Sequence, residues 1–184
     1  MIQDKKDLAY YLNQDKLAMG IHRNQPKIIG DEIWKFEICL RKTEYYFNKK
    51  NLIGKFISKF YRLRLRRLQL RYGFSIPLNV FGPGLAIVHT GPIIVSEYAS
   101  IGKNCRIQAM TVIGATNGMK KAPIIGDDVY ISVGAKIIGD IRVGNGVAVG
   151  AGAVVVKDVM DGVTVGGVPA KVISRNGSQQ HLIR

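Results

Sequence analysis

Residues 125–154 read IGDDVY, ISVGAK, IIGDIR, VGNGVA and VGAGAV, five consecutive blocks of six residues that each open with Ile or Val. The same frame runs through residues 95–118 and 155–160, and the six residues 119–124 interrupt it. Ten blocks open with an aliphatic residue in this way: Val95, Ile101, Ile107, Ile113, Ile125, Ile131, Ile137, Val143, Val149 and Val155. The fifth position of a block is usually small or β-branched, as at Ala99, Cys105, Thr111, Ala135 and Ala153. A fixed period of six is therefore the dominant pattern of the sequence.

This period predicts a stack of triangular coils. One block forms a short strand and a tight corner, so three blocks make one complete coil. The aliphatic opener points inward, the small fifth residue fills the corner, and Gly or Asn allows the turn. Because no coil can bury its own face, successive coils stack and share one core. Strands of a sandwich alternate with a period of two, which would not place an aliphatic residue at every sixth position. We expect a mainly β fold, a parallel β-helix.

The first two-fifths of the chain has the spacing of helices instead. A first helix follows the capping residue Asp4, and a second follows Asp31. A third runs from Leu52 to about Tyr72 and ends at Gly73, where a left-handed cap is easiest. The expected organisation is a helical N-terminal domain, a hexapeptide-repeat β-helix domain and a polar C-terminal tail, over residues 1–73, 74–175 and 176–184.

Composition excludes several classes of protein. The 184 residues are 47% hydrophobic and 22% charged, which is not the composition of a disordered chain. The two cysteines, Cys39 and Cys105, exclude a disulfide scaffold and a four-cysteine zinc site and favour a reducing compartment. No N-terminal stretch resembles a signal peptide, and no run approaches the ~20 apolar residues of a membrane span. We expect a cytoplasmic protein.

The positive charge is concentrated in the helical part. Residues 1–72 hold 17 Lys and Arg against 7 Asp and Glu, so +10 of the net +14 lies there. On the third expected helix the cations form two stripes, Lys55, Lys59, Arg62 and Arg66, and then Arg64, Arg67 and Arg71. Two interpretations stay open: a solvated face, or peripheral contact of helix 52–72 with anionic lipid at the inner membrane face. Nucleic acid is not expected as a partner, because no aromatic platform, helix-turn-helix or zinc signature accompanies the cations.

The repeat resembles the hexapeptide-repeat acyltransferases, and most closely their serine acetyltransferase branch. The stretches that carry the resemblance are GLAIVHTG (84–91), TVIGAT (111–116), GAKIIG (134–139) and GGVPAK (166–171). It covers residues 74–173, and the GGVPAK ending is specific to members that use acyl-CoA. The resemblance implies a left-handed coil, acetyl-CoA as co-substrate and a homotrimer with its active site between subunits.

The resemblance also assigns a general base. The family's histidine matches His89, within Ile87-Val88-His89-Thr90-Gly91. An acceptor hydroxyl must lose its proton as it attacks a thioester, and imidazole is the side chain poised to take it near pH 7. The other two histidines, His22 and His181, lie in the helical part and in the tail. A β-helix can also carry a zinc-dependent carbonic anhydrase site, but that site needs three histidines, so no metal is expected.

On the acceptor side the sequence departs from the serine acetyltransferases. Phe74 stands where the family has the Asp that orients the base, and Ala122 replaces a second family histidine. Asn79 is the residue we expect to orient His89 instead. These losses, with the stretch FGPGL (81–85), resemble members that acetylate sugar hydroxyls in surface-polysaccharide synthesis. We therefore expect a small-molecule or lipid-linked sugar as acceptor and L-serine to be a poor one. The alternative is serine O-acetylation in cysteine biosynthesis.

On the coenzyme side the motifs are intact. Small residues before and after the interruption would let the pantetheine arm lie along the wall of the β-helix, and lysines would meet its phosphates. The residues expected to bind acetyl-CoA are Gly114, Ala115, Thr116, Lys120, Lys121, Ala135, Ala151 and Lys171. Ala135 and Ala151 are expected at matching corners of neighbouring coils. Each lysine could equally be a solvated surface residue.

Overall fold

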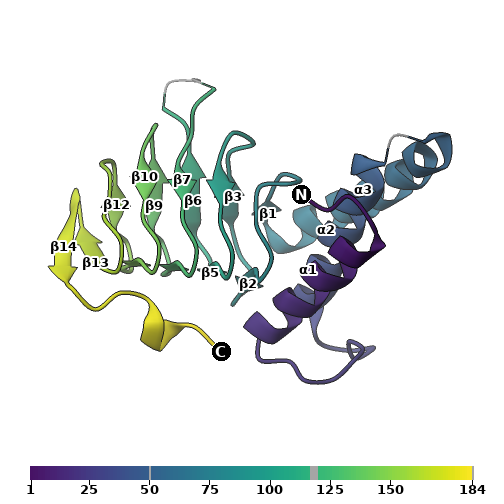
Figure 1. Ribbon diagram of the computed structural model, residues 1–184, viewed down its shortest axis with the longest axis horizontal. Helices are drawn as coiled ribbons and strands as arrows, with labels where there is room; N and C mark the ends of the chain where they lie inside the picture. Colours follow the sequence, from purple (N-terminus) through teal and green to yellow (C-terminus); the bar gives the residue numbers. More distant parts are fainter. Residues whose placement is uncertain (50, 117–119, 184) are drawn as a thin grey trace.

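The computed structural model describes residues 1–49, 51–116 and 120–183, and places helices at one end of a stack of β-coils (Figure 1). The helices come first in the chain: α1 (Lys5–Ala18), α2 (Glu32–Asn48) and α3 (Leu52–Tyr72). Short strands follow and form three sheets. The first sheet contains β1 (Phe74–Ser75), β3 (Ile93–Val95), β6 (Thr111–Gly114), β9 (Lys136–Ile138) and β12 (Val154–Val155). The second contains β4 (Ser100–Ile101), β7 (Ile124–Ile125) and β10 (Arg142–Val143). The third contains β2 (Ala86–Ile87), β5 (Arg106–Ile107), β8 (Tyr130–Ile131), β11 (Ala148–Val149), β13 (Thr164–Gly167) and β14 (Ala170–Ser174).

The pairing register confirms the coil of three blocks. Within the repeat, neighbouring strands of a sheet are parallel, and where the chain between them is uninterrupted they are offset by three blocks of six, as for Ile93 and Thr111 or for Lys136 and Val154. The offset is 19 or 20 residues at the first coil and 16 residues between β11 and β13. Across the interruption the offset is one block longer, as for Ser100 and Ile124. The six extra residues therefore leave the coil and return to it without changing the register.

The inward positions are also confirmed. All ten aliphatic openers are buried, with at most 4% of each residue exposed. They stack in three columns along the coils, because each opener pairs with the opener of the next coil. The small residues at the fifth positions are buried as well, and together the columns form one continuous core. The β13–β14 hairpin, whose strands are antiparallel, ends the stack at the side away from the helices (Figure 1).

The helix boundaries follow local signals, with one difference. Asp4 caps α1 through a hydrogen bond from the Asp7 backbone N–H, and Gly73 ends α3 with a φ of +77°. Asp31 holds the N-cap position of α2, as expected, but its side chain makes no cap hydrogen bond. Its carboxylate instead accepts from the Lys27 backbone N–H and pairs with Arg23. No helix among the described residues is long and apolar enough to cross a bilayer.

A buried charged cluster joins the helices to the first coil. This cluster, Asp15, Glu37, Arg41 and Glu44, is nearly inaccessible to solvent. Arg41 forks onto Asp15 with N–O distances of 2.7 and 3.3 Å, and donates to Glu44 and to the carbonyls of Phe81 and Gly82. The Asp15 carboxylate accepts from the backbone N–H groups of Gly84 and Leu85. The first coil has no coil before it, so these side chains take the hydrogen bonds that a preceding strand would make.

Glu37 completes the cluster. Its Oε1 accepts from the backbone N–H of Ile87 at 3.0 Å, and its Oε2 has no partner among the described residues. Burial raises the pKa of this carboxyl well above its ordinary value, and the charge of Asp15 raises it further. Burial therefore favours the protonated form of Glu37, whose side chain holds β2 through the Ile87 hydrogen bond.

The C-terminal tail packs back along the coils toward the helices (Figure 1). Ser178 is buried, and its backbone N–H donates to the Gly146 carbonyl at 2.9 Å. The His181 ring stacks on Tyr130, with 4.5 Å between ring centroids. The tail is thus part of the folded body, although its sequence is polar.

Candidate active site

His89 lies at a widened corner of the first coil. Ile87 pairs with Ile107, and Val95 pairs with Ile113, so this corner spans eight residues where the next coil spans six. The two extra residues carry His89 outward, and its side chain is exposed. The backbone on either side is fixed, because Val88 N–H donates to the Ile107 carbonyl and Gly91 N–H donates to the Tyr72 carbonyl, each at 3.0 Å.

Gly91 makes this corner possible. Its φ is +129°, a backbone conformation that side-chain-bearing residues rarely adopt. A Cβ at this position would lie 3.2 Å from the Cβ of Ala109 on the coil below. Any other residue would therefore force the His89 corner away from its neighbour.

A column of small and apolar residues leads from His89 along the same edge of the stack. The register of the third sheet places Ala109, Val133, Ala151 and Gly167 at equivalent corners of successive coils. Backbone hydrogen bonds tie the corners together, from Gly134 N–H to the Ala109 carbonyl and from Gly152 N–H to the Val133 carbonyl. Coils are about 4.8 Å apart, so four steps span roughly 19 Å. The last three members of this corner column are exposed.

The corner column ends at the GGVPAK hairpin. Gly167 pairs with Ala170 across the turn between β13 and β14, and Lys171 follows with an exposed side chain. Lys136 is also exposed, and its Nζ donates to the Gly134 carbonyl at 3.2 Å, next to the column. One edge of the protein therefore carries an exposed imidazole at one end, small residues along its length and cations toward the other end.

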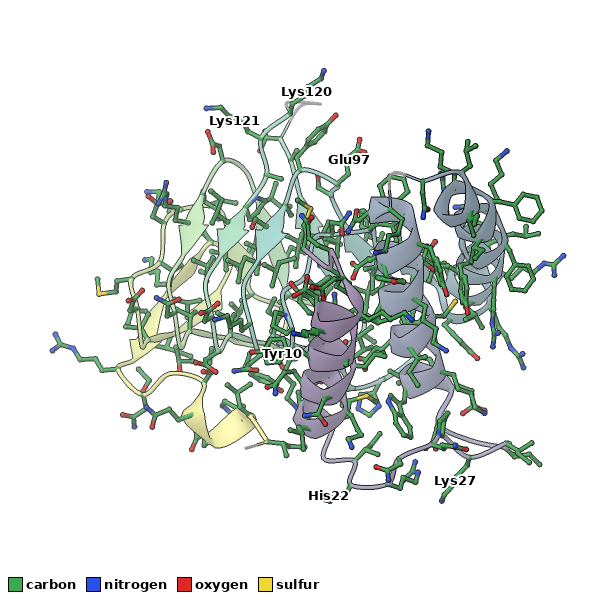
Figure 2. The ribbon with its side chains drawn as sticks, turned by 45° about the vertical axis from the view of Figure 1, so that its right-hand side comes forward. Tyr10, His22, Lys27, Glu97, Lys120 and Lys121 are labelled. Atoms are coloured by element: carbon green, nitrogen blue, oxygen red, sulfur yellow. The ribbon has the colours of Figure 1, made fainter. Side chains whose placement is uncertain are left out.

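The remaining expected residues lie at another corner. Gly114 ends β6, and Ala115 and Thr116 follow it, where the chain leaves the first sheet for the second. Figure 2 shows Lys120 and Lys121 extending from a loop that stands off the coils. Lys121 Nζ pairs with Asp140 Oδ2 at 2.8 Å on the surface, which raises the pKa of this lysine. The sequence predicts a loop that stands off the coil over residues 117–123, and residues 117–119 of it lie outside the described residues.

Two parts of the expected site are thus separated within one chain. His89 lies between the third and first sheets, whereas Thr116 and Lys120 follow the first sheet at its other edge. One side of the triangle is a block of six residues, which spans roughly 20 Å at ~3.3 Å per residue. No side chain reaches across that distance. The two groups therefore cannot contact one small acceptor within a single chain.

The structure corrects the expected match of Ala135 with Ala151. Lys136 pairs with Val154, so Ala135 is level with Ala153 and both are fully buried. The Ala135 side chain points into the core and cannot touch a ligand outside. Ala151 is exposed and belongs to the corner column, two residues earlier in the turn. The error arose because the two alanines are slightly closer in the chain than one full coil of three blocks.

The structure does not pair Asn79 with His89. The Asn79 side-chain amide exchanges hydrogen bonds with Asn48 of α2, at 2.9 and 3.1 Å, and its backbone N–H donates to Glu44. Phe74 is buried, with its ring 4.8 Å from that of Phe36. Ala122 is buried in the core as well. Both apolar replacements are therefore accommodated by packing.

Other chemistry finds little support in the described residues. Burial raises the pKa of the Cys105 thiol to about 12 and also raises that of Cys39, so neither is a ready nucleophile. Among the residues described, no group of three His, Cys, Asp or Glu side chains could hold a metal ion. His22 lies beyond α1, in the helical part (Figure 2).

Sequence comparison finds relatives over nearly the whole chain. The serine acetyltransferase of Bacillus pumilus is 38% identical over 179 residues, which is 95% of this chain and 78% of that protein. The serine acetyltransferase of Bacillus subtilis is 33% identical over 180 residues, with the same shares. No protein-family model matches the chain.

Solved structures of serine acetyltransferases also resemble this chain. A serine acetyltransferase of Brucella abortus has 27% identity and a TM-score of 0.74, over 95% of this chain and 72% of that one. The same enzyme in complex with coenzyme A has a TM-score of 0.72 at 25% identity, over 94% and 70%. The Neisseria gonorrhoeae serine acetyltransferase in complex with serine has a TM-score of 0.68 at 26% identity, over 91% and 69%.

A three-sided stack of six-residue repeats with an exposed histidine at a widened corner is the architecture of a hexapeptide-repeat acyltransferase. The two Bacillus relatives are more than 30% identical over 95% of this chain, and this likeness identifies the family within that class. The chain belongs to the serine acetyltransferase family.

Proposed function

We propose that the protein transfers the acetyl group of acetyl-CoA to the hydroxyl of L-serine, with His89 as general base. The observation that carries this proposal is the exposed His89 at the head of the corner column, in a chain that matches serine acetyltransferases over 95% of its length. The left-handed turn of the coils is part of the proposal, supported by the likeness to the serine acetyltransferase structures.

The chemistry needs one base that also returns a proton. The imidazole of His89 takes the proton of the acceptor hydroxyl as its oxygen attacks the thioester carbonyl. The tetrahedral intermediate collapses, the C–S bond breaks, and the imidazolium gives its proton to the departing thiolate. The products are an acetyl ester and CoA-SH, and the base ends neutral. General-base assistance of this kind contributes about 10²–10⁴-fold to the rate.

Acetyl-CoA would lie along the corner column. The thioester would sit beside His89, and the pantetheine arm would follow Ala109, Val133 and Ala151, whose small or apolar side chains permit close approach. Lys171, which is exposed in the hairpin at the far end, would meet the phosphates of the coenzyme as a point charge. The Brucella abortus relative crystallised with coenzyme A supports this co-substrate.

We further propose a homotrimer. A base exposed on one corner needs a second wall to exclude water from the thioester. In a threefold assembly, the corner of one copy that carries His89 can face the corner of the next that carries Thr116 and Lys120. This arrangement would unite the two groups that one chain keeps apart. Light scattering coupled to gel filtration should give three times the mass of 20.3 kDa, or a multiple of it. A monomer would contradict the shared site.

The acceptor has a second candidate, a sugar hydroxyl. Serine carries a carboxylate and an ammonium, and Phe74 and Ala122 place buried apolar side chains where the family resemblance expects an Asp and a His. That observation favours a less charged acceptor. The relatives, one of them crystallised with serine, weigh more and support L-serine.

One assay decides between the acceptors. CoA release is followed with L-serine, with a panel of amino sugars and with nucleotide sugars. Saturable turnover with serine well above the sugars supports the proposal. Turnover confined to a sugar would replace serine with that acceptor and keep the acetyl transfer. No CoA release with any hydroxyl acceptor would contradict an acetyltransferase function.

A further inference from the structure

Helix α3 exposes an apolar face that nothing in the described structure covers. Between 55% and 83% of each of six large apolar residues is accessible: Leu52, Ile53, Phe56, Phe60, Leu63 and Leu70. The opposite side of α3 packs on the rest of the protein, because Leu65 is buried in the hydrophobic core. An exposed cluster that contains two phenylalanine rings is a mark of an interaction surface.

The cations of α3 flank this apolar face on both sides. At 100° per residue, the six apolar residues fall within a sector of about 100°. Lys55, Lys59, Arg62 and Arg66 line one border of that sector, Arg64 and Arg71 line the other, and the exposed Arg67 lies within the sector toward the end of the helix. An apolar stripe bordered by cations is the arrangement of a helix that lies in the plane of a membrane interface.

The charge of the helix selects the partner. Residues 52–72 contain seven Lys and Arg and no Asp or Glu. If a second copy docked α3 on α3, unpaired cations would face each other across the contact. An anionic lipid surface offers a partner to both kinds of side chain on α3: acyl chains contact the aromatic rings, and lipid phosphates bind the cations.

A groove beside the cationic border fits the same partner. It has a volume of about 480 Å³ and is lined by Arg62, Arg66, Gln69, Ser75, Ile76 and Leu78, among others. Two guanidinium groups at its edge can hydrogen-bond phosphate oxygens. The groove adjoins the apolar face, so a lipid headgroup could enter it while the face lies on the bilayer.

We propose that α3 docks the protein onto an anionic membrane surface, with Phe56 and Phe60 inserted among the lipids and the flanking cations on the headgroups. The catalytic edge is not part of this surface, since His89 and the corner column belong to the β-coils. Membrane docking would therefore hold the enzyme at the bilayer without occupying its active site.

Co-sedimentation with vesicles tests the proposal on the full chain. Vesicles contain one part phosphatidylglycerol to two parts phosphatidylcholine, or phosphatidylcholine alone, at low and high salt. The wild type should bind the anionic vesicles at least tenfold more strongly than the neutral ones, and salt should weaken binding. Phe56→Ser with Phe60→Ser, and separately Arg62→Glu with Arg66→Glu, should each weaken binding at least tenfold. The matched control Lys103→Glu with Lys157→Glu changes exposed lysines of the β-coils and should stay within twofold.

Two results would overturn the proposal. One is equal or absent binding of the wild type to anionic and neutral vesicles. The other is a Phe56→Ser, Phe60→Ser variant that binds vesicles normally but has a smaller mass in light scattering, which would mean that another copy covers the face. Circular dichroism and thermal unfolding establish that each variant is folded before it is compared.

Discussion

Replacing Arg41 by Met tests the buried cluster that joins the helices to the first coil. Arg41 is fully buried and makes its hydrogen bonds to Asp15, Glu44 and the carbonyls of Phe81 and Gly82. Burial by itself lowers the pKa of this guanidinium, but the charges of Asp15 and Glu44 raise it above its ordinary value, so it stays charged. Met fills a similar volume and leaves both carboxylates without their counter-ion.

Breaking a buried ion pair by removing one partner costs about 3–5 kcal/mol. For a chain of 184 residues each kcal/mol lowers Tm by roughly 2–4 °C, so we expect Tm to fall by about 6–20 °C. Urea unfolding followed by circular dichroism measures the change in free energy, and Arg142→Ala, at an exposed site, should change it by less than about 0.5 kcal/mol. Adding Asp15→Asn to Arg41→Met should recover part of the loss, because Asn Oδ1 can still accept from Gly84 and Leu85. A loss no larger than that of Arg142→Ala would refute the proposed role of the cluster.

Three further predictions use other features. The pKa of Glu37 is raised in the folded state above its ordinary value of about 4.3. Its protonated form therefore stabilises the fold fully below that ordinary pKa. This stability is lost as pH rises toward the folded-state pKa, by up to about 1.4 kcal/mol per pH unit. Glu37→Gln should therefore gain stability relative to wild type as pH rises above the ordinary carboxyl pKa in urea unfolding; an unchanged difference would contradict this. Gly84→Ala would place a Cβ 2.3 Å from Asn104 Oδ1, at a φ of +85°. It should lower stability by more than the control Gly152→Ala, whose Cβ meets nothing within 4 Å. Equal losses of stability would show that the Asn104 side chain moves aside. Lys171→Ala should raise the KM for acetyl-CoA several-fold with little change in kcat, because the lysine binds the coenzyme equally in the ground state and the transition state. An unchanged KM would mean that Lys171 does not bind the coenzyme phosphates.

The six-residue repeat was sufficient to predict most of the fold from the sequence. A period of six with aliphatic openers specifies the coil, the inward positions and the register, and each of the ten openers is buried as expected. The end of α3 followed from Gly73 for a similarly local reason. Such features depend on residues near one another in the chain, so a single sequence displays them.

The features that were missed depend on distant contacts. Asp15 and Arg41 are 26 residues apart, and Glu37 and Ile87 are 50 apart, so no spacing rule joins them. Asn79 was expected beside His89 because the sequence could not show that α2 would supply Asn48 as its partner. The sequence shows two similar apolar lines on α3: Phe56, Phe60 and Leu63 form one, and Ile57, Tyr61, Leu65 and Leu68 form the other. Only packing reveals that the first line is exposed, whereas Leu65 of the second is buried. The corner column could have been found by counting residues from each aliphatic opener.

The most direct test of the account is the steady-state rate of CoA release for wild type and His89→Ala, with acetyl-CoA and L-serine. We expect kcat to fall by about 10² or more, while calorimetry gives nearly unchanged affinity for CoA, because the imidazole acts on the proton and not on the coenzyme. His22→Ala, in the helical part, serves as the matched histidine control and should retain full turnover. A His89→Ala variant that keeps close to wild-type turnover would contradict the central claim.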